Sequence, residues 1–127
     1  MSTMDNGIGW FEIGTDDPAG AERFYGGLFG WTFASDEGDT MPYRIVTTPA
    51  AGSIKGGIFG HGGQLPNYAV FMVVVPDVAQ TCRRAEEAGG KVLVPATTTD
   101  TGLVFAQLKD PAGNQFGVYT PQPGSDT

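Results

Sequence analysis

Histidine and cysteine are scarce in this 127-residue chain, which has one of each, His61 and Cys82. A single cysteine cannot form an internal disulfide, which fits a reducing compartment and predicts a cytoplasmic protein. A Ser–His–Asp arrangement would have to use His61. Because Cys82 lies in the apolar stripe of a predicted helix, we expect a buried, inert thiol rather than a nucleophile.

Basic residues are also few, since seven Lys and Arg stand against 14 Asp and Glu, for a net charge of −7. Such a chain repels phosphate backbones and anionic lipid, so we expect neither nucleic acid nor a membrane as a partner. The longest unbroken apolar run, Tyr68–Val75, is too short to cross a bilayer. Residues Met1–Gly7 have no basic stretch and no apolar core, so no secretory signal is expected.

Apolar residues make up 40% of the sequence, enough for the core of a single domain over residues 1–127. Apolar periodicity and turn residues predict an α+β fold in which the order strand–helix–three strands occurs twice. The two βαβββ modules span about 8–60 and about 68–120, and residues 121–127 are expected to be a flexible tail. The predicted strands are 8–15, 31–34, 43–48, 57–59, 68–75, 91–95, 104–108 and 115–119.

Each module has a predicted helix that begins at an aspartate, Asp17 or Asp77, which can cap the first turn. In the first helix an apolar stripe predicts core positions for Phe24, Tyr25, Leu28 and Phe29. The run 68–75 is apolar at nearly every position, which predicts that both faces of this strand are covered, one by a helix and the other by the cavity or a dimer partner.

An internal repeat supports the two modules. A shift of 60 residues superposes Asp17 on Asp77 and Gly30 on Gly90. A shift of 57 superposes Phe59-Gly60 on Phe116-Gly117 near the end of each module.

Several motifs appear in a fixed order: WFEIGTDDPAGAERFYGGLFGW near the start, then PDV, RRAEEAGGKVLVP and KDPAGNQFGVY. In this order they resemble the vicinal oxygen chelate superfamily, which comprises glyoxalase, bleomycin-resistance and extradiol dioxygenase-like domains. The resemblance covers about Ile8 to Tyr119. It implies two modules whose strands curl around a shared cavity, often in a dimer, and we therefore expect a homodimer.

In metal-dependent members of this superfamily, four ligands come from the first and last strand of each module. Matching the motifs places the first-strand positions at Trp10 and Val70. Counting from Asp110 places a last-strand position at Gly117, and the shift of 57 carries it to Gly60. None of these side chains can coordinate a metal, so the resemblance implies a member without metal ligands, and we expect no metal and no cofactor.

The single histidine does not change this expectation. His61 follows Gly60, where strand alternation would aim it at the opposite face, and it is expected to be an exposed loop residue. Gly56-Gly57 and Gly62-Gly63 are interpreted as turn glycines. An oxygen-rich site around Glu12, Gln107 and Gln115, or a site joining Glu12 to His61, stays open as an alternative.

Strand alternation directs several side chains toward the cavity, where they would form an apolar, aromatic wall with a few polar groups. Gly60 and Gly117 would leave space for a ligand there. Such a wall suits a flat organic molecule that stacks on aromatic rings. The predicted ligand-binding residues are Trp10, Glu12, Tyr43, Tyr68, Val70, Met72, Gln107, Gln115 and Tyr119.

Glu12 is the candidate catalytic residue. A carboxylate among Trp10, Phe33 and Val70 would be desolvated, its pKa would rise, and it could act as a general acid or base. Alternatively Glu12 is structural, accepting a hydrogen bond or pairing with Arg44.

Three functions are compatible with these residues. The first is metal-independent binding of a small aromatic or hydrophobic molecule, as in sequestration or resistance, and the acidic surface would favour a cationic ligand. The second is a cofactor-free lyase, isomerase or cyclase that uses Glu12. The third is a metal-dependent, glyoxalase- or dioxygenase-like enzyme. We favour the first function, because it requires neither a catalytic group nor a metal ligand.

Overall fold

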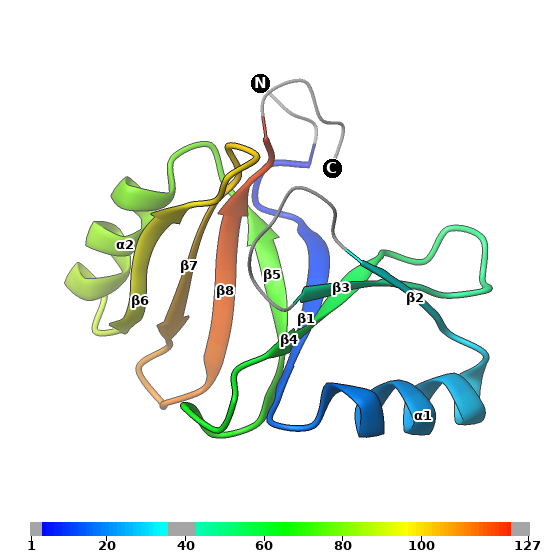
Figure 1. Ribbon diagram of the computed structural model, residues 1–127. Helices are drawn as coiled ribbons and strands as arrows, with labels where there is room; N and C mark the ends of the chain where they lie inside the picture. The colour runs from blue at the N-terminus through cyan, green and yellow to red at the C-terminus, as the bar shows by residue number, and fades with distance from the viewer. Residues whose placement is uncertain (1–3, 36–42, 123–127) are drawn as a thin grey trace. The chain divides into compact units, whose positions relative to one another are not determined.

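A computed structural model of the chain describes residues 4–35 and 43–122. Within these residues the order β-α-β-β-β occurs twice, which confirms the predicted α+β fold (Figure 1). The elements are β1 (Ile8–Thr15), α1 (Pro18–Phe29), β2 (Thr32–Ser35), β3 (Tyr43–Thr47), β4 (Gly56–Gly60), β5 (Tyr68–Val74), α2 (Val78–Glu87), β6 (Lys91–Thr98), β7 (Val104–Lys109) and β8 (Gln115–Thr120). Of the predicted tail, residues 123–127 lie outside the described residues.

The chain forms two compact units. One comprises Trp10–Ala69, and the other, called here the C-terminal unit, comprises the described residues before Trp10 and from Val70 on. In the Trp10–Ala69 unit the strand order is β2-β3-β4-β1, with β1 and β4 parallel. In the C-terminal unit the order is β5-β8-β7-β6, with β5 and β8 parallel. Each unit therefore repeats one parallel pairing between its first and last strand.

Both helices begin where the sequence predicts. The Asp17 side chain accepts a hydrogen bond from the Gly20 amide, and Asp77 accepts one from the Gln80 amide, each at 3.0 Å. These bonds satisfy amides that have no partner inside the first helical turn. Gly30 ends α1 in the left-handed conformation, with φ 73°.

The two helices differ in how they pack. In α2, Val78 and Cys82 are buried against Ala106, Leu108 and Val118, so the expectation of a buried thiol is confirmed. The predicted core positions in α1 are wrong for Phe24, Leu28 and Phe29, which are 61%, 59% and 52% exposed.

Only part of the α1 stripe reaches the sheet. Ala21 and Tyr25 pack against the core of Ile13, Val46 and Ile58. Tyr25 also stacks on Trp31, with ring centroids 5.3 Å apart. The apolar stripe is therefore wider than the surface of the unit that covers it.

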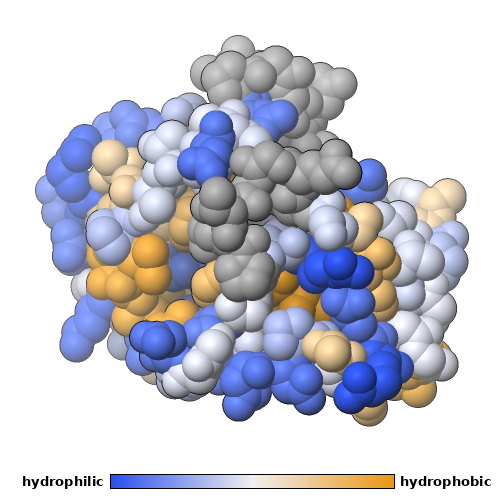
Figure 2. Space-filling view, in the orientation of Figure 1, coloured by the Kyte–Doolittle hydropathy of each residue, from blue (hydrophilic) through white to orange (hydrophobic). Residues whose placement is uncertain are grey.

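Strand β5 has one face that is buried within this chain. Val70, Met72 and Val74 are buried, but Phe71 between them is 47% exposed and stacks on Phe116, with ring centroids 6.0 Å apart. Hydrophobic surface is also visible over β6 and β7 in the C-terminal unit (Figure 2). None of the helices in the described part of the chain is long and apolar enough to span a membrane.

The core of the C-terminal unit can be tested with two leucines. Leu108 on β7 is fully buried, whereas Leu93 on β6 is 44% exposed. We expect Leu108→Ala to lower the free energy of unfolding by about 2–5 kcal/mol, because it removes buried methyl groups and leaves a cavity. Leu93→Ala, as the matched control, should cost less than about 1 kcal/mol. Urea unfolding of both variants measures the difference, and equal losses would contradict this assignment of the core.

Candidate functional site

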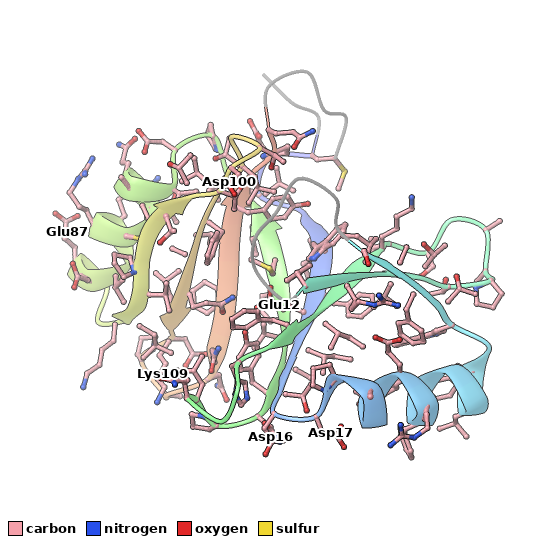
Figure 3. All side chains as sticks on the ribbon, in the orientation of Figure 1. Glu12, Asp16, Asp17, Glu87, Asp100 and Lys109 are labelled. Atoms are coloured by element: carbon pink, nitrogen blue, oxygen red, sulfur yellow. The ribbon has the colours of Figure 1, made fainter. Side chains whose placement is uncertain are left out.

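The candidate site is built around Glu12, in the middle of β1. Alternation along the strand places Trp10, Glu12 and Gly14 on one face, and the parallel register sets Glu12 beside Gly57 of β4. The Glu12 side chain is only 9% exposed. Figure 3 shows Glu12 within the strands, whereas Asp16 and Asp17 lie beyond the end of β1. Glu12 is thus a buried carboxylate, as predicted, but the predicted neighbour Phe33 is wrong, because Phe33 packs against the core of Ile13, Val46 and Ile58 on the other face of the sheet.

Two tyrosines donate hydrogen bonds to this carboxylate. The Tyr68 hydroxyl donates to Oε2 at 2.6 Å, and the Tyr43 hydroxyl donates to Oε1 at 3.0 Å. The Tyr43 oxygen in turn accepts a hydrogen bond from Trp10 Nε1 at 2.9 Å. Trp10, Glu12, Tyr43 and Tyr68, called here the Glu12 network, all belong to the Trp10–Ala69 unit.

Two glycines make room for the tyrosines of the network. A Cβ at Gly57 would overlap the hydroxyl end of Tyr43, and a Cβ at Gly14 would overlap the ring of Tyr68. The interpretation of Gly56-Gly57 as turn glycines is wrong, because both lie inside β4. Sequence reasoning missed Gly14 and Gly57 as site residues. The available signal was glycine within a strand, which often marks a close approach by another group.

The electrostatics of the network follow from burial. Desolvation raises the pKa of Glu12 above its usual value, and the hydrogen bonds from Tyr68 and Tyr43 partly oppose that rise. Burial, followed by the nearby Glu12 charge, raises the pKa of Tyr43 well above its ordinary range. The same two causes raise the pKa of Tyr68. Both phenols therefore stay protonated and act as neutral donors, while Glu12 is the group that can exchange a proton.

The alternative partner considered for Glu12 is engaged elsewhere. Arg44 Nε lies 3.1 Å from Glu22 Oε2 in an ion pair. Arg44 follows Tyr43 on β3, and its partner in the register is Ile58, so its side chain points to the other face of the sheet. The predicted pairing of Glu12 with Arg44 is therefore wrong, whereas the predicted hydrogen-bonded carboxylate is observed.

The remaining predicted ligand residues gather in the C-terminal unit. The strand registers set Gly117 beside both Met72 and Gln107. A Cβ at Gly117 would lie 2.7 Å from Met72 Cε and 3.2 Å from Gln107 Nε2, so these side chains already occupy the space predicted for a ligand. Gln115 Nε2 also donates to Gln107 Oε1 at 3.4 Å. The structure thus divides the predicted residues into the Glu12 network and a second set, Val70, Met72, Gln107, Gln115 and Tyr119.

Tyr119 differs from the other tyrosines of the site. It is buried, and its hydroxyl has no hydrogen-bond partner within the described residues. Its ring lies on β8, where Tyr119 is the register partner of Val74 on β5.

The register corrects one of the predicted metal-ligand positions. Gly57 lies beside Glu12 in one unit as Gly117 lies beside Met72 in the other, so a shift of 60 residues, not 57, relates the last strands. Gly60 pairs with Thr15 and belongs to the opposite face. The corrected position, Gly57, still offers no donor atom.

His61 is not the exposed loop residue that the sequence predicts. Its side chain is 6% exposed, Nδ1 accepts a hydrogen bond from the Gly63 amide at 3.0 Å, and Nε2 lies 2.8 Å from Asn67 Oδ1. Among residues 4–35 and 43–122 there is no group of three or more His, Cys, Asp or Glu that could hold a metal ion. The residues at the four family positions, Trp10, Gly57, Val70 and Gly117, carry no side-chain atom that can donate an electron pair to a divalent cation, so they do not fit such an ion.

The repeated βαβββ order and the parallel pairing of each first and last strand define an α+β protein with two related modules. A family model described as "Glyoxalase/Bleomycin resistance protein/Dioxygenase superfamily" matches residues 7–118. The chain belongs to this superfamily, as the resemblance of its motifs implied.

Individual relatives agree with this membership. The chain is 36% identical to the anthracycline biosynthesis protein DnrV of Streptomyces peucetius, over 98% of this chain and 45% of that protein. It therefore spans about half the length of this relative. Among solved structures, methylmalonyl-CoA epimerase from Mycobacterium tuberculosis has a TM-score of 0.60 at 15% identity, covering 97% of this chain and 93% of the epimerase. A superfamily member from Vibrio splendidus 12B01 has a TM-score of 0.59 at 13% identity, covering 87% and 96%. These two structures share the fold.

The glycines under the tyrosines can be tested by adding a methyl group. Gly57→Ala should destabilise the protein by about 1–3 kcal/mol, because the new Cβ displaces Tyr43 from Glu12. Trp10 fluorescence should change as well, because its hydrogen-bond partner moves. Gly27→Ala is the control, since Gly27 lies in α1 with nothing within 4 Å, and it should be neutral or stabilising by up to about 1 kcal/mol. Similar unfolding curves for both variants would contradict the close packing at Gly57.

The pKa of Glu12 predicts a pH dependence of stability. Because burial raises this pKa above 4.5, ionisation of Glu12 costs folding free energy. This contribution to stability is fully present below the unfolded pKa and is lost as pH rises through the folded pKa. The wild type should therefore lose stability relative to Glu12→Gln as the pH rises from the ordinary carboxyl pKa of 4.5 through the raised pKa of the folded protein. Urea unfolding of both proteins across this range measures the difference, and a constant difference would contradict a raised pKa.

Proposed function

We propose that this chain binds a small aromatic or hydrophobic organic molecule without a metal ion, and that the Glu12 network provides the polar contact. The observation that carries the proposal is a buried carboxylate held by two neutral phenols on an aromatic face. Trp10, Tyr43 and Tyr68 are only partly buried and keep some exposed surface. Their rings can stack on a flat molecule, while Glu12 selects a ligand that carries a hydrogen-bond donor or a positive charge.

The comparisons support a ligand of this class. DnrV is named for the biosynthesis of anthracyclines, which are fused-ring aromatic compounds, although its role belongs to a protein about twice as long. The net charge of −7 favours a cationic ligand over an anionic one. The expected homodimer and cytoplasmic location remain predictions.

A second function is supported by the raised pKa of Glu12. A carboxyl group that holds its proton more tightly than usual can give it to, or take it from, a bound substrate. In this case the chain would be a cofactor-free lyase, isomerase or cyclase, with Glu12 as the general acid or base. The third, metal-dependent alternative is not proposed, because the family's ligand positions carry indole, isopropyl and glycine.

Binding can be tested with an amino-sugar anthracycline and its sugar-free aglycone, both followed by their own fluorescence. We expect the wild type to bind both and the amine-bearing compound more tightly. Glu12→Gln should lower the affinity for the amine-bearing compound roughly tenfold, which is the effect of losing one charge-assisted hydrogen bond. It should lower the affinity for the aglycone much less.

Glu87→Gln is the matched control, because Glu87 is exposed at the end of α2 in the C-terminal unit. It removes the same charge and should leave both affinities within about twofold. If the two Gln variants behave alike, the ligand does not bind at Glu12. If Glu12→Gln retains binding of a substrate but stops its conversion, the second function is favoured.

A further inference from the structure

We propose that His61 and Asn67 are positioning residues that hold Tyr68 against Glu12. The segment that contains them, residues 61–67, joins the end of β4 to the start of β5. The inference deepens the proposed function, because it concerns the same site, but its main evidence and its test do not depend on a ligand.

The segment is first attached to the end of β1. The His61 amide donates a hydrogen bond to the Thr15 carbonyl at 3.1 Å. The Asp16 amide donates to Asn67 Oδ1 at 3.1 Å, and Asn67 Nδ2 donates to Asp16 Oδ1 at 3.3 Å. The start of the segment is therefore hydrogen-bonded to Thr15, the last residue of β1, and its end is hydrogen-bonded to Asp16, the next residue.

The His61 ring connects the two ends of the segment. Because its Nδ1 accepts the Gly63 amide, Nε2 must carry the ring proton, and Nε2 donates to Asn67 Oδ1 at 2.8 Å. Asn67 Oδ1 thus accepts from both His61 and Asp16. His61 is buried although it lies outside the strands, and both ring nitrogens are satisfied. We call Asp16, His61 and Asn67 the latch.

The latch is close in the chain to Tyr68 and to Gly14, the residue of β1 on which the Tyr68 ring packs. Asn67 directly precedes Tyr68 in the chain, and Asp16 lies two residues after Gly14, over which the Tyr68 ring packs. Fixing Asn67 to Asp16 therefore fixes the backbone of Tyr68 relative to β1. A tyrosine hydroxyl at 2.6 Å from Glu12 Oε2 requires such fixed placement, because small backbone shifts are amplified at the end of a long side chain.

The latch can be tested through the titration of Glu12. The Tyr68 hydrogen bond lowers the pKa of Glu12 against the effect of burial, so loosening Tyr68 should raise that pKa. The test follows the Glu12 side-chain carboxyl carbon by NMR as a function of pH. We expect Asn67→Ala to raise the apparent pKa of Glu12 in the same direction as Tyr68→Phe. The Asn67→Ala/Tyr68→Phe double variant should raise the Glu12 pKa no more than Tyr68→Phe alone, because both substitutions act through the hydrogen bond from Tyr68 to Glu12.

Asn114→Ala is the matched control. Asn114 Nδ2 donates to Asp110 Oδ2 at 3.0 Å in a tight turn of the C-terminal unit, so the variant breaks a similar Asn–Asp contact in the unit that does not contain Glu12. It should leave the Glu12 titration unchanged. If Asn67→Ala fails to fold, His61→Phe provides the second variant, because it keeps the ring volume and removes both nitrogens. It should raise the Glu12 pKa as well.

An unchanged Glu12 titration in a folded Asn67→Ala or His61→Phe protein would overturn the inference, since the latch would then be structural only. An additive shift in the Asn67→Ala/Tyr68→Phe double variant would overturn it too. Because the titration needs no ligand, failure of the latch and failure of the proposed function are separate results. If the anthracycline binds the wild type, Asn67→Ala should weaken this binding, whereas Asn114→Ala should leave it unchanged.

Discussion

Much of the Trp10–Ala69 unit depends on keeping one carboxylate, Glu12, out of water. A buried carboxylate is costly unless hydrogen-bond donors replace its hydration. Tyr43 from β3 and Tyr68 from the start of β5 provide those donors. The tyrosines reach Glu12 only because Gly57 and Gly14 leave space for them. A polar group on one strand thus constrains residue choice on three others.

The two modules use the same register for different chemistry. A shift of 60 residues relates Glu12 beside Gly57 to Met72 beside Gly117. In the first case the space above the glycine is taken by a tyrosine that serves a carboxylate. In the second it is taken by the thioether of Met72 and the amide of Gln107. The scaffold fixes where side chains converge, whereas the individual side chains decide whether the place is polar, apolar or metal-binding.

Local patterns predicted the fold but overestimated burial. The aspartate caps, the two βαβββ modules and the apolar face of α2 could be read from spacing, because each depends on residues close in sequence. The exposed Phe24, Leu28 and Phe71 could not. A stripe or a run of apolar residues shows which surface is available for packing, and only the partner element determines how much of it is covered.

The sequence by itself determined the family, the order of the elements and the burial of Glu12. These follow from residue identity and from strand alternation. Only the tertiary structure decided that Tyr43 and Tyr68, rather than Arg44, bind Glu12, that Gly57 rather than Gly60 lies beside it, and that His61 is buried against Asn67. The physical reason is that these contacts join residues distant in the chain, whose meeting depends on strand register and on side-chain reach, neither of which a periodic pattern encodes.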